Sequence, residues 1–193
     1  MTTFGACSFA GDKLRPEYAR CDMAEGPSFV CGTCGKIHEG LVKDMGFALP
    51  EDVWSIPAPE RKTRAVFDTD LCRFGERHFI RCLLRIPFVG RTDYFGWGVW
   101  VEVDRHDFDR YVEFYQKDGS AEPLVIGRLA NRIPCYPDAA GEVVRIKFGV
   151  AGIRPDVLVD VGSETSLGLD HNRGINDARH HQILADLGQT TKG

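Results

Sequence analysis

Residues 78–103 read HFIRCLLRIPFVGRTDYFGWGVWVEV and decide the fold class. In His78–Pro87, apolar side chains alternate with polar ones such as Arg81, which is the pattern of a half-buried strand. Tyr94–Val103 puts a Trp and three valines at alternate positions, so it predicts a second strand with one apolar face. Gly90–Asp93 lies between the two and can turn the chain. The stretch therefore predicts a long β-hairpin.

The second face of Tyr94–Val103 carries Gly96, Gly98 and Trp100. Two glycines beside a Trp leave a shallow trough on that face of the strand, because glycine has no side chain to fill it. A helix could pack into the trough, or a ligand could occupy it. We therefore take Gly96, Gly98 and Trp100 as a possible ligand surface.

Shorter strands are expected on both sides of this hairpin. Short runs of β-forming residues, some alternating apolar with polar and bounded by Gly and Pro, indicate strands near residues 45–49, 123–133, 143–150 and 156–161. Strands in adjacent runs, with helices placed between and after them, favour an α+β fold. The sheet is expected to be mainly antiparallel with flanking helices.

Helices are predicted where the apolar period changes. Helical turns are expected at 50–54 and 60–64. A longer helix begins at an Asp104 N-cap and presents Phe108, Tyr111, Val112 and Tyr115 on one stripe. A terminal helix is expected over Asp177–Leu187, with His180 and His181 on its flank.

Composition indicates one globular domain. The chain has 193 residues, 43% of them hydrophobic, and a formal net charge of −4. An acidic balance argues against general nucleic-acid binding, and the absence of a long apolar run argues against a membrane span. No basic region followed by an apolar stretch opens the chain, and seven cysteines at irregular spacing indicate reduced thiols, so we expect a cytoplasmic protein. We expect a loosely ordered arm at 1–27, a domain at 28–187 and a frayed tail at 188–193.

A second motif, Cys31-Gly-Thr-Cys34-Gly-Lys-Ile-His38, is typical of a metal-binding knuckle. Gly35, directly after the second cysteine, permits the positive φ of a tight turn that points N–H groups at the sulfurs. A thioredoxin-like redox site would instead begin a helix between the cysteines, and Gly35 and Gly40 disfavour that helix. The sequence therefore predicts an N-terminal zinc-knuckle-like hairpin.

The knuckle needs two further ligands. His38 lies four residues past Cys34, and Cys72 follows a segment with several turns. Cys31, Cys34, His38 and Cys72 together make a Cys3His set, which is common in structural zinc sites. Cys7 and Cys21 lie in the arm and are weaker candidates.

Other candidate ligands have simpler explanations. Asp68 and Asp70 form a D-x-D pair that could hold a divalent cation, although turn acids more often cap their own backbone. His78 could serve as a hydrogen-bonding residue at a strand entrance. Cys82 lies in the apolar phase of its strand, so core burial accounts for it.

Several motifs together resemble the DUF2199 family of uncharacterised bacterial proteins, over roughly residues 28–187. The motifs are the cysteine knuckle, Asp70-Leu-Cys72, Phe95-Gly-Trp-Gly-Val-Trp-Val101, Pro134-Cys-Tyr-Pro-Asp138 and Gly174-Ile175. The resemblance implies no activity. This chain departs from the family pattern at Cys135, where Gly is expected, at Ala139, where Thr is expected, and at Thr165-Ser166, where a His-Pro pair is expected.

Three functions stay open from the sequence. The first is a domain stabilised by a structural zinc that binds a protein or small-molecule partner. The second is a thiol–disulfide oxidoreductase using Cys31 and Cys34. The third treats the cysteines as incidental and the Gly96–Trp100 trough as the binding surface. Whether the protein is an enzyme stays open too, since neither a His-Glu-x-x-His helix nor a Gly-x-Ser-x-Gly elbow is present.

Overall fold

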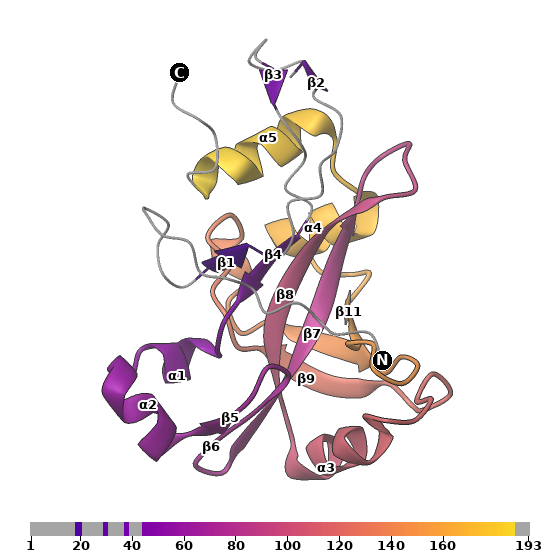
Figure 1. Ribbon diagram of the computed structural model, residues 1–193. Helices are drawn as coiled ribbons and strands as arrows, with labels where there is room; N and C mark the ends of the chain where they lie inside the picture. Colours follow the sequence, from indigo (N-terminus) through magenta and orange to yellow (C-terminus); the bar gives the residue numbers. More distant parts are fainter. Residues whose placement is uncertain (1–17, 21–28, 31–36, 39–43, 188–193) are drawn as a thin grey trace.

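The computed structural model describes residues 18–20, 29–30, 37–38 and 44–187 (Figure 1). The strands are β1 (Tyr18–Arg20), β2 (Phe29–Val30), β3 (Ile37–His38), β4 (Asp44–Phe47), β5 (Val66–Phe67), β6 (Leu71–Phe74), β7 (Arg77–Pro87), β8 (Tyr94–Val103), β9 (Val125–Leu129), β10 (Val143–Lys147) and β11 (Asp156–Val159). The helices are α1 (Glu51–Trp54), α2 (Ala58–Arg64), α3 (Arg105–Phe114), the 3-10 turn η1 (Pro137–Ala139), α4 (Ser166–Arg173) and α5 (Asp177–Asp186).

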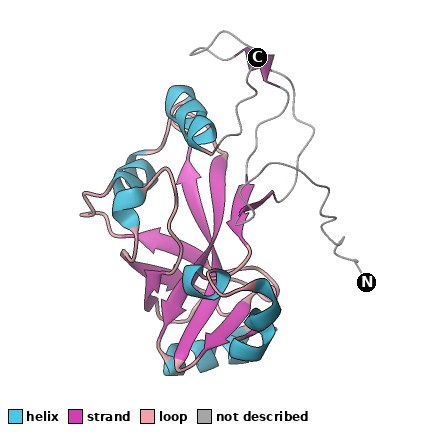
Figure 2. Ribbon diagram, turned by 90° about the vertical axis from the view of Figure 1, so that its left-hand side faces the viewer, coloured by secondary structure: helices cyan, strands magenta, loops and turns pink. Residues whose placement is uncertain are grey.

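The predicted α+β class with a mainly antiparallel sheet is confirmed. Nine of these strands join one sheet, in which β4–β8 and β11–β7 are parallel pairings. Helices α4 and α5 lie near one end of the long β7–β8 hairpin, and α1, α2 and α3 lie near the other (Figure 1). Figure 2 shows the same division from the side, with the strands running between the helical ends.

The β7–β8 hairpin is the axis of the sheet. Its register runs from His78 opposite Val103 to Pro87 opposite Tyr94, so the two strands pair along almost their whole length. Each strand also changes partner on its outer edge: β7 pairs with β6 and then β11, and β8 pairs with β4 and then β9. The strands β7, β8, β9, β10 and β11 thereby close into a five-stranded barrel.

The core fills the inside of this barrel. Ile80, Cys82, Leu84 and Ile86 of β7 are fully buried, as the alternation predicts. They face alternate apolar residues of the other barrel strands, including Val99, Val101, Val144, Ile146, Val157 and Val159. Burying each such aliphatic side chain stabilises the fold by about 1.5–3 kcal/mol, so the barrel interior is the main source of its stability.

Helix α3 begins where predicted. The Asp104 side chain accepts a hydrogen bond from the backbone N–H of Asp107, which is an N-cap. Phe108 and Tyr111 are buried as expected, but Val112 is 47% exposed. The buried stripe of α3 is therefore narrower than the apolar stripe that the sequence predicts, because the helix packs on the barrel through one side only.

Helix α5 corrects one expectation. The sequence placed His180 on the flank of the helix, but it is buried, with its ring centroid 5.2 Å from those of both Phe88 and Phe95. Both phenylalanines belong to the tip of the long hairpin, so α5 closes that end of the domain. Next to it, Gly174 has φ +80° and Ile175 pairs with the end of β7, its N–H donating to the Pro87 carbonyl at 2.8 Å.

Strands β2 and β3 pair antiparallel, with Phe29 opposite His38 and Val30 opposite Ile37. The cysteine segment between them, residues 31–36, lies outside the described residues. The zinc-knuckle hairpin therefore stays a prediction. Most of the predicted arm at 1–27 and the whole tail at 188–193 also lie outside the described residues.

Candidate functional site

The glycine trough lies on the outer face of the sheet, where β4 runs beside β8. Asp44 of β4 is opposite Gly96, and Gly46 is opposite Gly98. The Asp44 carboxylate lies directly over Gly96, because a Cβ placed there would overlap its Oδ1 atom. This part of the trough is therefore neither open nor packed against a helix. The charged side chain of Asp44, from the neighbouring strand, covers it.

The guanidinium of Arg81 lies over the other two glycines. A Cβ at Gly46 would lie 2.9 Å from Arg81 Nη2, and one at Gly98 would lie 3.5 Å from the same atom. Arg81 is on β7 and is only 9% exposed; its Nη1 donates to the Thr69 carbonyl at 3.4 Å. The two facing glycines therefore make room for a nearly buried cation on an otherwise flat strand pair.

A cavity of about 250 Å³ opens beside this guanidinium. Its lining comes from β4, β7, β8 and the turn before β11: Asp44, Met45, Gly46, Arg81, Cys82, Leu83, Tyr94, Gly98, Ile153 and Arg154. Two arginines, one carboxylate and one phenol thus meet over a glycine floor. Such a mixture of a few polar groups on a shaped apolar wall is typical of small-molecule sites.

Asp70 fixes the Arg154 side of the cavity. Its Oδ1 accepts from Arg154 Nε at 2.6 Å, and its Oδ2 accepts from the Tyr115 hydroxyl at 2.9 Å. Burial alone would raise the pKa of Asp70, but the Arg154 and Tyr115 contacts outweigh it and lower the pKa. Asp70 is therefore a charged anchor that holds Arg154 at the rim.

Two of the sequence motifs that suggested a family lie at this cavity. The Asp70 and Gly96–Trp100 motifs flank the cavity, and residues 30–175 match the family described as an uncharacterized protein conserved in bacteria, DUF2199. The chain belongs to the DUF2199 family. No curated protein matches it, and no solved structure matches it. Among the described residues of this DUF2199 chain, no helix is long and apolar enough to cross a membrane.

Of the three trough residues predicted from the DUF2199 sequence, Gly98 lines the cavity. Gly96 lies under Asp44, and Trp100 is fully buried. The Trp100 indole donates to the Phe47 carbonyl at 3.2 Å, so its ring is a packing element beneath the surface. A ligand in the cavity would meet Gly98 and Arg81 rather than the indole.

The predicted metal ligands are only partly described. Cys31 and Cys34 lie outside the described residues, and His38 ends strand β3. Cys72 is on β6, 1% exposed, and burial raises the pKa of its thiol to about 11. Nearby, Asp68 caps its own turn, since its Oδ1 accepts from the N–H groups of Asp70 and Leu71, as the sequence suggested.

The described cysteines are not activated thiols. Cys82 and Cys135 are buried like Cys72, and burial raises the pKa of each, that of Cys135 to about 12. A reactive thiol needs a lowered pKa and access to solvent. Any thiol chemistry would therefore depend on cysteines outside the described part of the chain.

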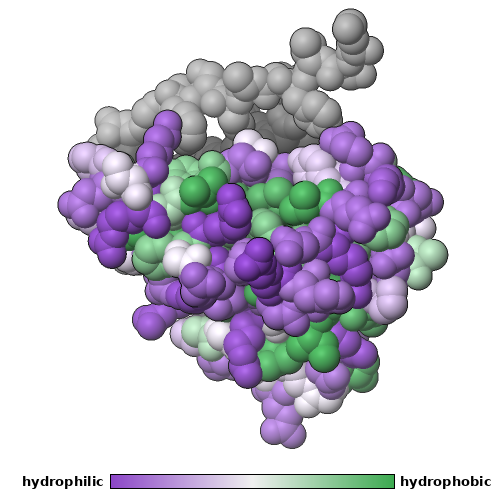
Figure 3. Space-filling model, turned by 90° about the horizontal axis from the view of Figure 1, so that it is seen from below, coloured by the Kyte–Doolittle hydropathy of each residue, from purple (hydrophilic) through white to green (hydrophobic). Residues whose placement is uncertain are grey.

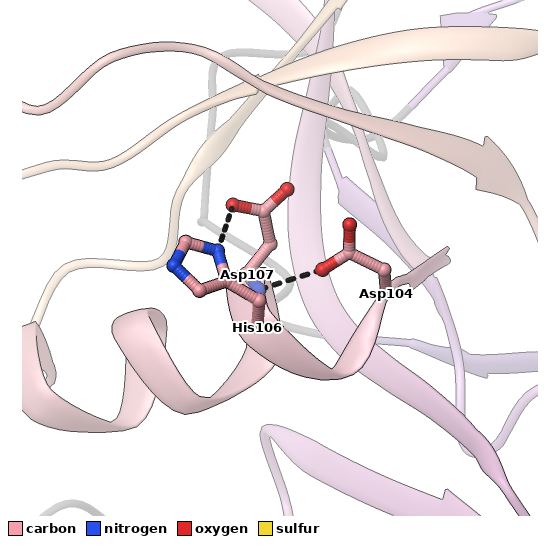
Figure 4. A group of neighbouring side chains, drawn as sticks. All are labelled: Asp104, His106 and Asp107. Atoms are coloured by element: carbon pink, nitrogen blue, oxygen red, sulfur yellow. Dashed lines mark hydrogen bonds and ion pairs between the residues drawn. The ribbon is translucent and has the colours of Figure 1, made fainter.

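One group of possible metal ligands stands apart from the cavity. Asp104, His106 and Asp107 lie together at the start of α3, with His106 Nδ1 3.7 Å from an oxygen of Asp107 (Figure 4). Asp104 and His106 are exposed, and the Asp104 carboxylate already caps the helix. The arrangement is accounted for by helix capping.

Sequence reasoning missed Asp44, Gly46, Arg81 and Arg154 as site residues. Arg81 carried a usable signal, because it is a cation within an apolar strand and its neighbour across the hairpin belongs to the glycine-rich run. Asp44 and Arg154 carried no sequence signal that marks a site. Their positions depend on the parallel β4–β8 pairing and on the β11–β7 pairing that brings the turn before β11 to β7. Local patterns reveal neither pairing.

Proposed function

We propose that the domain binds a small molecule bearing a carboxylate, in the cavity over Gly46 and Gly98. The observation that carries this proposal is the nearly buried Arg81 guanidinium at the cavity wall. A guanidinium held away from bulk water forms strong, charge-assisted hydrogen bonds to a carboxylate, and its planar fork matches the two oxygens. Arg154 adds a second cation at the rim.

The size and the remaining lining support a small ligand. A cavity of about 250 Å³ lies just below the range of drug-sized sites, so it suits a compact acid. The Asp44 carboxylate in the wall favours a ligand that also carries a hydrogen-bond donor or an ammonium group. Tyr94 and Leu83 offer the apolar contacts.

A titration followed through two backbone amides tests the proposal. Acetate, succinate and glutamate are added separately to the full chain, and the amide signals of Gly46 and Gly98 are followed by NMR. At least one acid should shift both signals in a saturable manner. Gly98→Val fills the cavity floor and should remove the response at Gly46. Ala140→Val, at an exposed, extended residue after η1, should keep the response at both glycines. If none of the acids perturbs Gly46 or Gly98, the proposal fails.

We also propose a structural zinc held by Cys31, Cys34, His38 and Cys72. The support is the Cys-Gly-x-Cys-Gly spacing, together with the strands β2 and β3 on either side of the turn. A closed Cys3His site supplies folding free energy and no open position for chemistry. Strand β4, which lines the carboxylate cavity, follows this segment within a few residues. The metal would therefore anchor the chain that enters the ligand site.

The alternative role for the same cysteines is thiol–disulfide exchange between Cys31 and Cys34. It requires a thiolate near neutral pH. Alkylation of metal-free, folded protein with iodoacetamide at pH 7 separates the two roles. Rapid labelling of one of these two cysteines would favour the oxidoreductase, and slow labelling of both would exclude it.

A further inference from the structure

A second hollow lies at the opposite end of the sheet from α5, between α2, the β6–β7 turn and the start of α3. Its volume is about 460 Å³, and none of its lining residues belongs to the carboxylate cavity. Figure 3 views the molecule from this end and shows a surface that is mostly hydrophilic, with hydrophobic patches between the polar side chains. We name this hollow the α2–α3 groove.

Positive charge gathers in the α2–α3 groove although the whole chain is acidic. Lys62, Arg64, Arg73 and Arg105 line it, against two acidic residues. Arg64 Nη1 lies 3.8 Å from Glu60 Oε2, and Arg105 Nε lies 3.6 Å from Asp109 Oδ2, so each arginine forms an ion pair. Among the described residues, the side chains of Lys62 and Arg73 have neither an ion-pair nor a hydrogen-bond partner. The lining therefore carries four cations and two acids, Glu76 and Asp109, and Lys62 and Arg73 are not held in ion pairs.

A nearly buried histidine lies in the wall of the α2–α3 groove. His78 is 8% exposed and packs against the Phe108 ring at 5.0 Å. Neither of its ring nitrogens has a hydrogen-bond partner among the described residues. Because the His78 ring lines the groove, its nitrogens are available to a ligand there. An acceptor bound in the groove would take a hydrogen bond from this ring.

The groove continues into an apolar hollow. A neighbouring cavity of about 380 Å³ shares Val66, Arg73 and Asp109 with it and extends to Phe108 and Val112. Val66 is 65% exposed and Val112 is 47% exposed, although both are large aliphatic residues. The combined surface is cationic at one end and apolar at the other. Its ligand should carry an anionic group on an apolar body.

We infer that the α2–α3 groove binds a small phosphate monoester with an apolar body. The phosphoryl group lies among Lys62, Arg73 and His78, and the body lies against Val66 and Val112. A phosphoryl group fits better than a carboxylate because it carries nearly two negative charges and three acceptor oxygens, which match two cations that are not in ion pairs and one imidazole. The site is independent of the carboxylate cavity.

Phenyl phosphate is the probe that tests the inference. Its affinity for the full chain is measured by calorimetry beside those of inorganic phosphate and benzoate. Phenyl phosphate should bind at least about tenfold more tightly than either, because only it carries both the phosphoryl and the apolar part. Equal affinity for benzoate would overturn the inference, and so would tighter binding of an oligoglutamate peptide.

Substitutions test whether phenyl phosphate binds in the α2–α3 groove. Arg73→Gln should weaken phenyl phosphate binding about tenfold, because it removes one charge-assisted contact from an exposed position that folding does not need. Val112→Ser should remove the advantage over inorganic phosphate and leave inorganic phosphate binding unchanged. Arg173→Gln is the matched control, since Arg173 is an exposed residue of α4 outside the groove. Wild-type affinity in Arg73→Gln, or an equal loss in Arg173→Gln, would overturn the inference.

Discussion

The side-chain oxygen of Asn131 accepts a hydrogen bond from the backbone N–H of Trp100 at 2.7 Å, across 31 residues of sequence. The Asn131 amide also donates to the Leu49 carbonyl at 2.9 Å, and the Trp100 indole donates to the Phe47 carbonyl. Both side chains are buried. This pair therefore joins β8 to the end of β4, the same strand that carries Asp44 and Gly46 to the carboxylate cavity.

Asn131→Ala should lower the free energy of unfolding by about 2–3 kcal/mol. The substitution leaves a buried N–H and a buried C=O without partners, and each such group costs about 1–3 kcal/mol. Urea denaturation measures the loss. Asn172→Ala is the control, because Asn172 makes one exposed hydrogen bond to the Asp160 carbonyl and should cost less than about 1 kcal/mol. Similar losses in the two variants would contradict the role of Asn131.

Gly96→Ala and Gly98→Ala should differ in stability although they change the same strand. A Cβ at Gly96 overlaps the Asp44 carboxylate, so this substitution should cost about 1–3 kcal/mol. A Cβ at Gly98 has its nearest neighbour, Gly46 Cα, at 3.4 Å, and should change stability by less than about 1 kcal/mol.

A double-mutant cycle identifies the cause of the Gly96 loss. In an Asp44→Ala background, Gly96→Ala should lose most of its cost, because the overlapping carboxylate is gone. Thermal unfolding of the four proteins in the cycle gives the coupling energy. A cost that persists without the Asp44 side chain would place the strain elsewhere in the strand.

The sheet was largely predictable because its longest strands carry a strong local signal. The observed bounds of β8, Tyr94–Val103, are those predicted, and β7 begins one residue earlier than predicted. Barrel closure was not predictable. It depends on β11 pairing with residues 83–84 of β7, a contact between segments more than seventy residues apart that no local period encodes.

The candidate site was predictable only in part, for a similar reason. Gly96 and Gly98 mark a trough because glycines in a strand are unusual. The residues that fill the trough, Asp44 and Arg81, arrive from other strands through long-range register. The same reason explains the error at His180: its environment comes from Phe88 at the hairpin tip and not from its own helix.

Asp138 should give the fold a pH-dependent contribution. Its carboxylate accepts hydrogen bonds from the N–H and the hydroxyl of Ser166 at the start of α4, and these contacts lower the pKa of Asp138. Since the folded-state pKa lies below the unfolded value of about 3.9, the stabilisation is present above about pH 4 and is lost as the pH falls through the folded-state pKa.

Asp138→Ala should therefore cost about 0.5–1 kcal/mol at pH 7 and almost nothing once the wild-type carboxyl is protonated. Urea denaturation of both proteins from pH 7 to pH 3 measures the difference. Asp118→Ala is the comparison, because Asp118 is also exposed and caps only its own turn at Ser120. A stability difference for Asp138 that is unchanged at pH 3 would rule out the charged capping interaction.

The zinc proposal makes a prediction about composition and stability together. Protein purified without chelator should contain about one zinc per chain, and Cys34→Ser and Cys72→Ser should each reduce that content and lower the melting temperature. Cys135→Ser is the matched control: its thiol is buried like that of Cys72 but lies outside the predicted ligand set, so zinc content should not change. Wild-type zinc content in Cys72→Ser, with loss in Cys34→Ser, would remove Cys72 from the ligand set. A folded protein free of zinc would remove the metal altogether, and with it the anchor proposed for the entrance to β4.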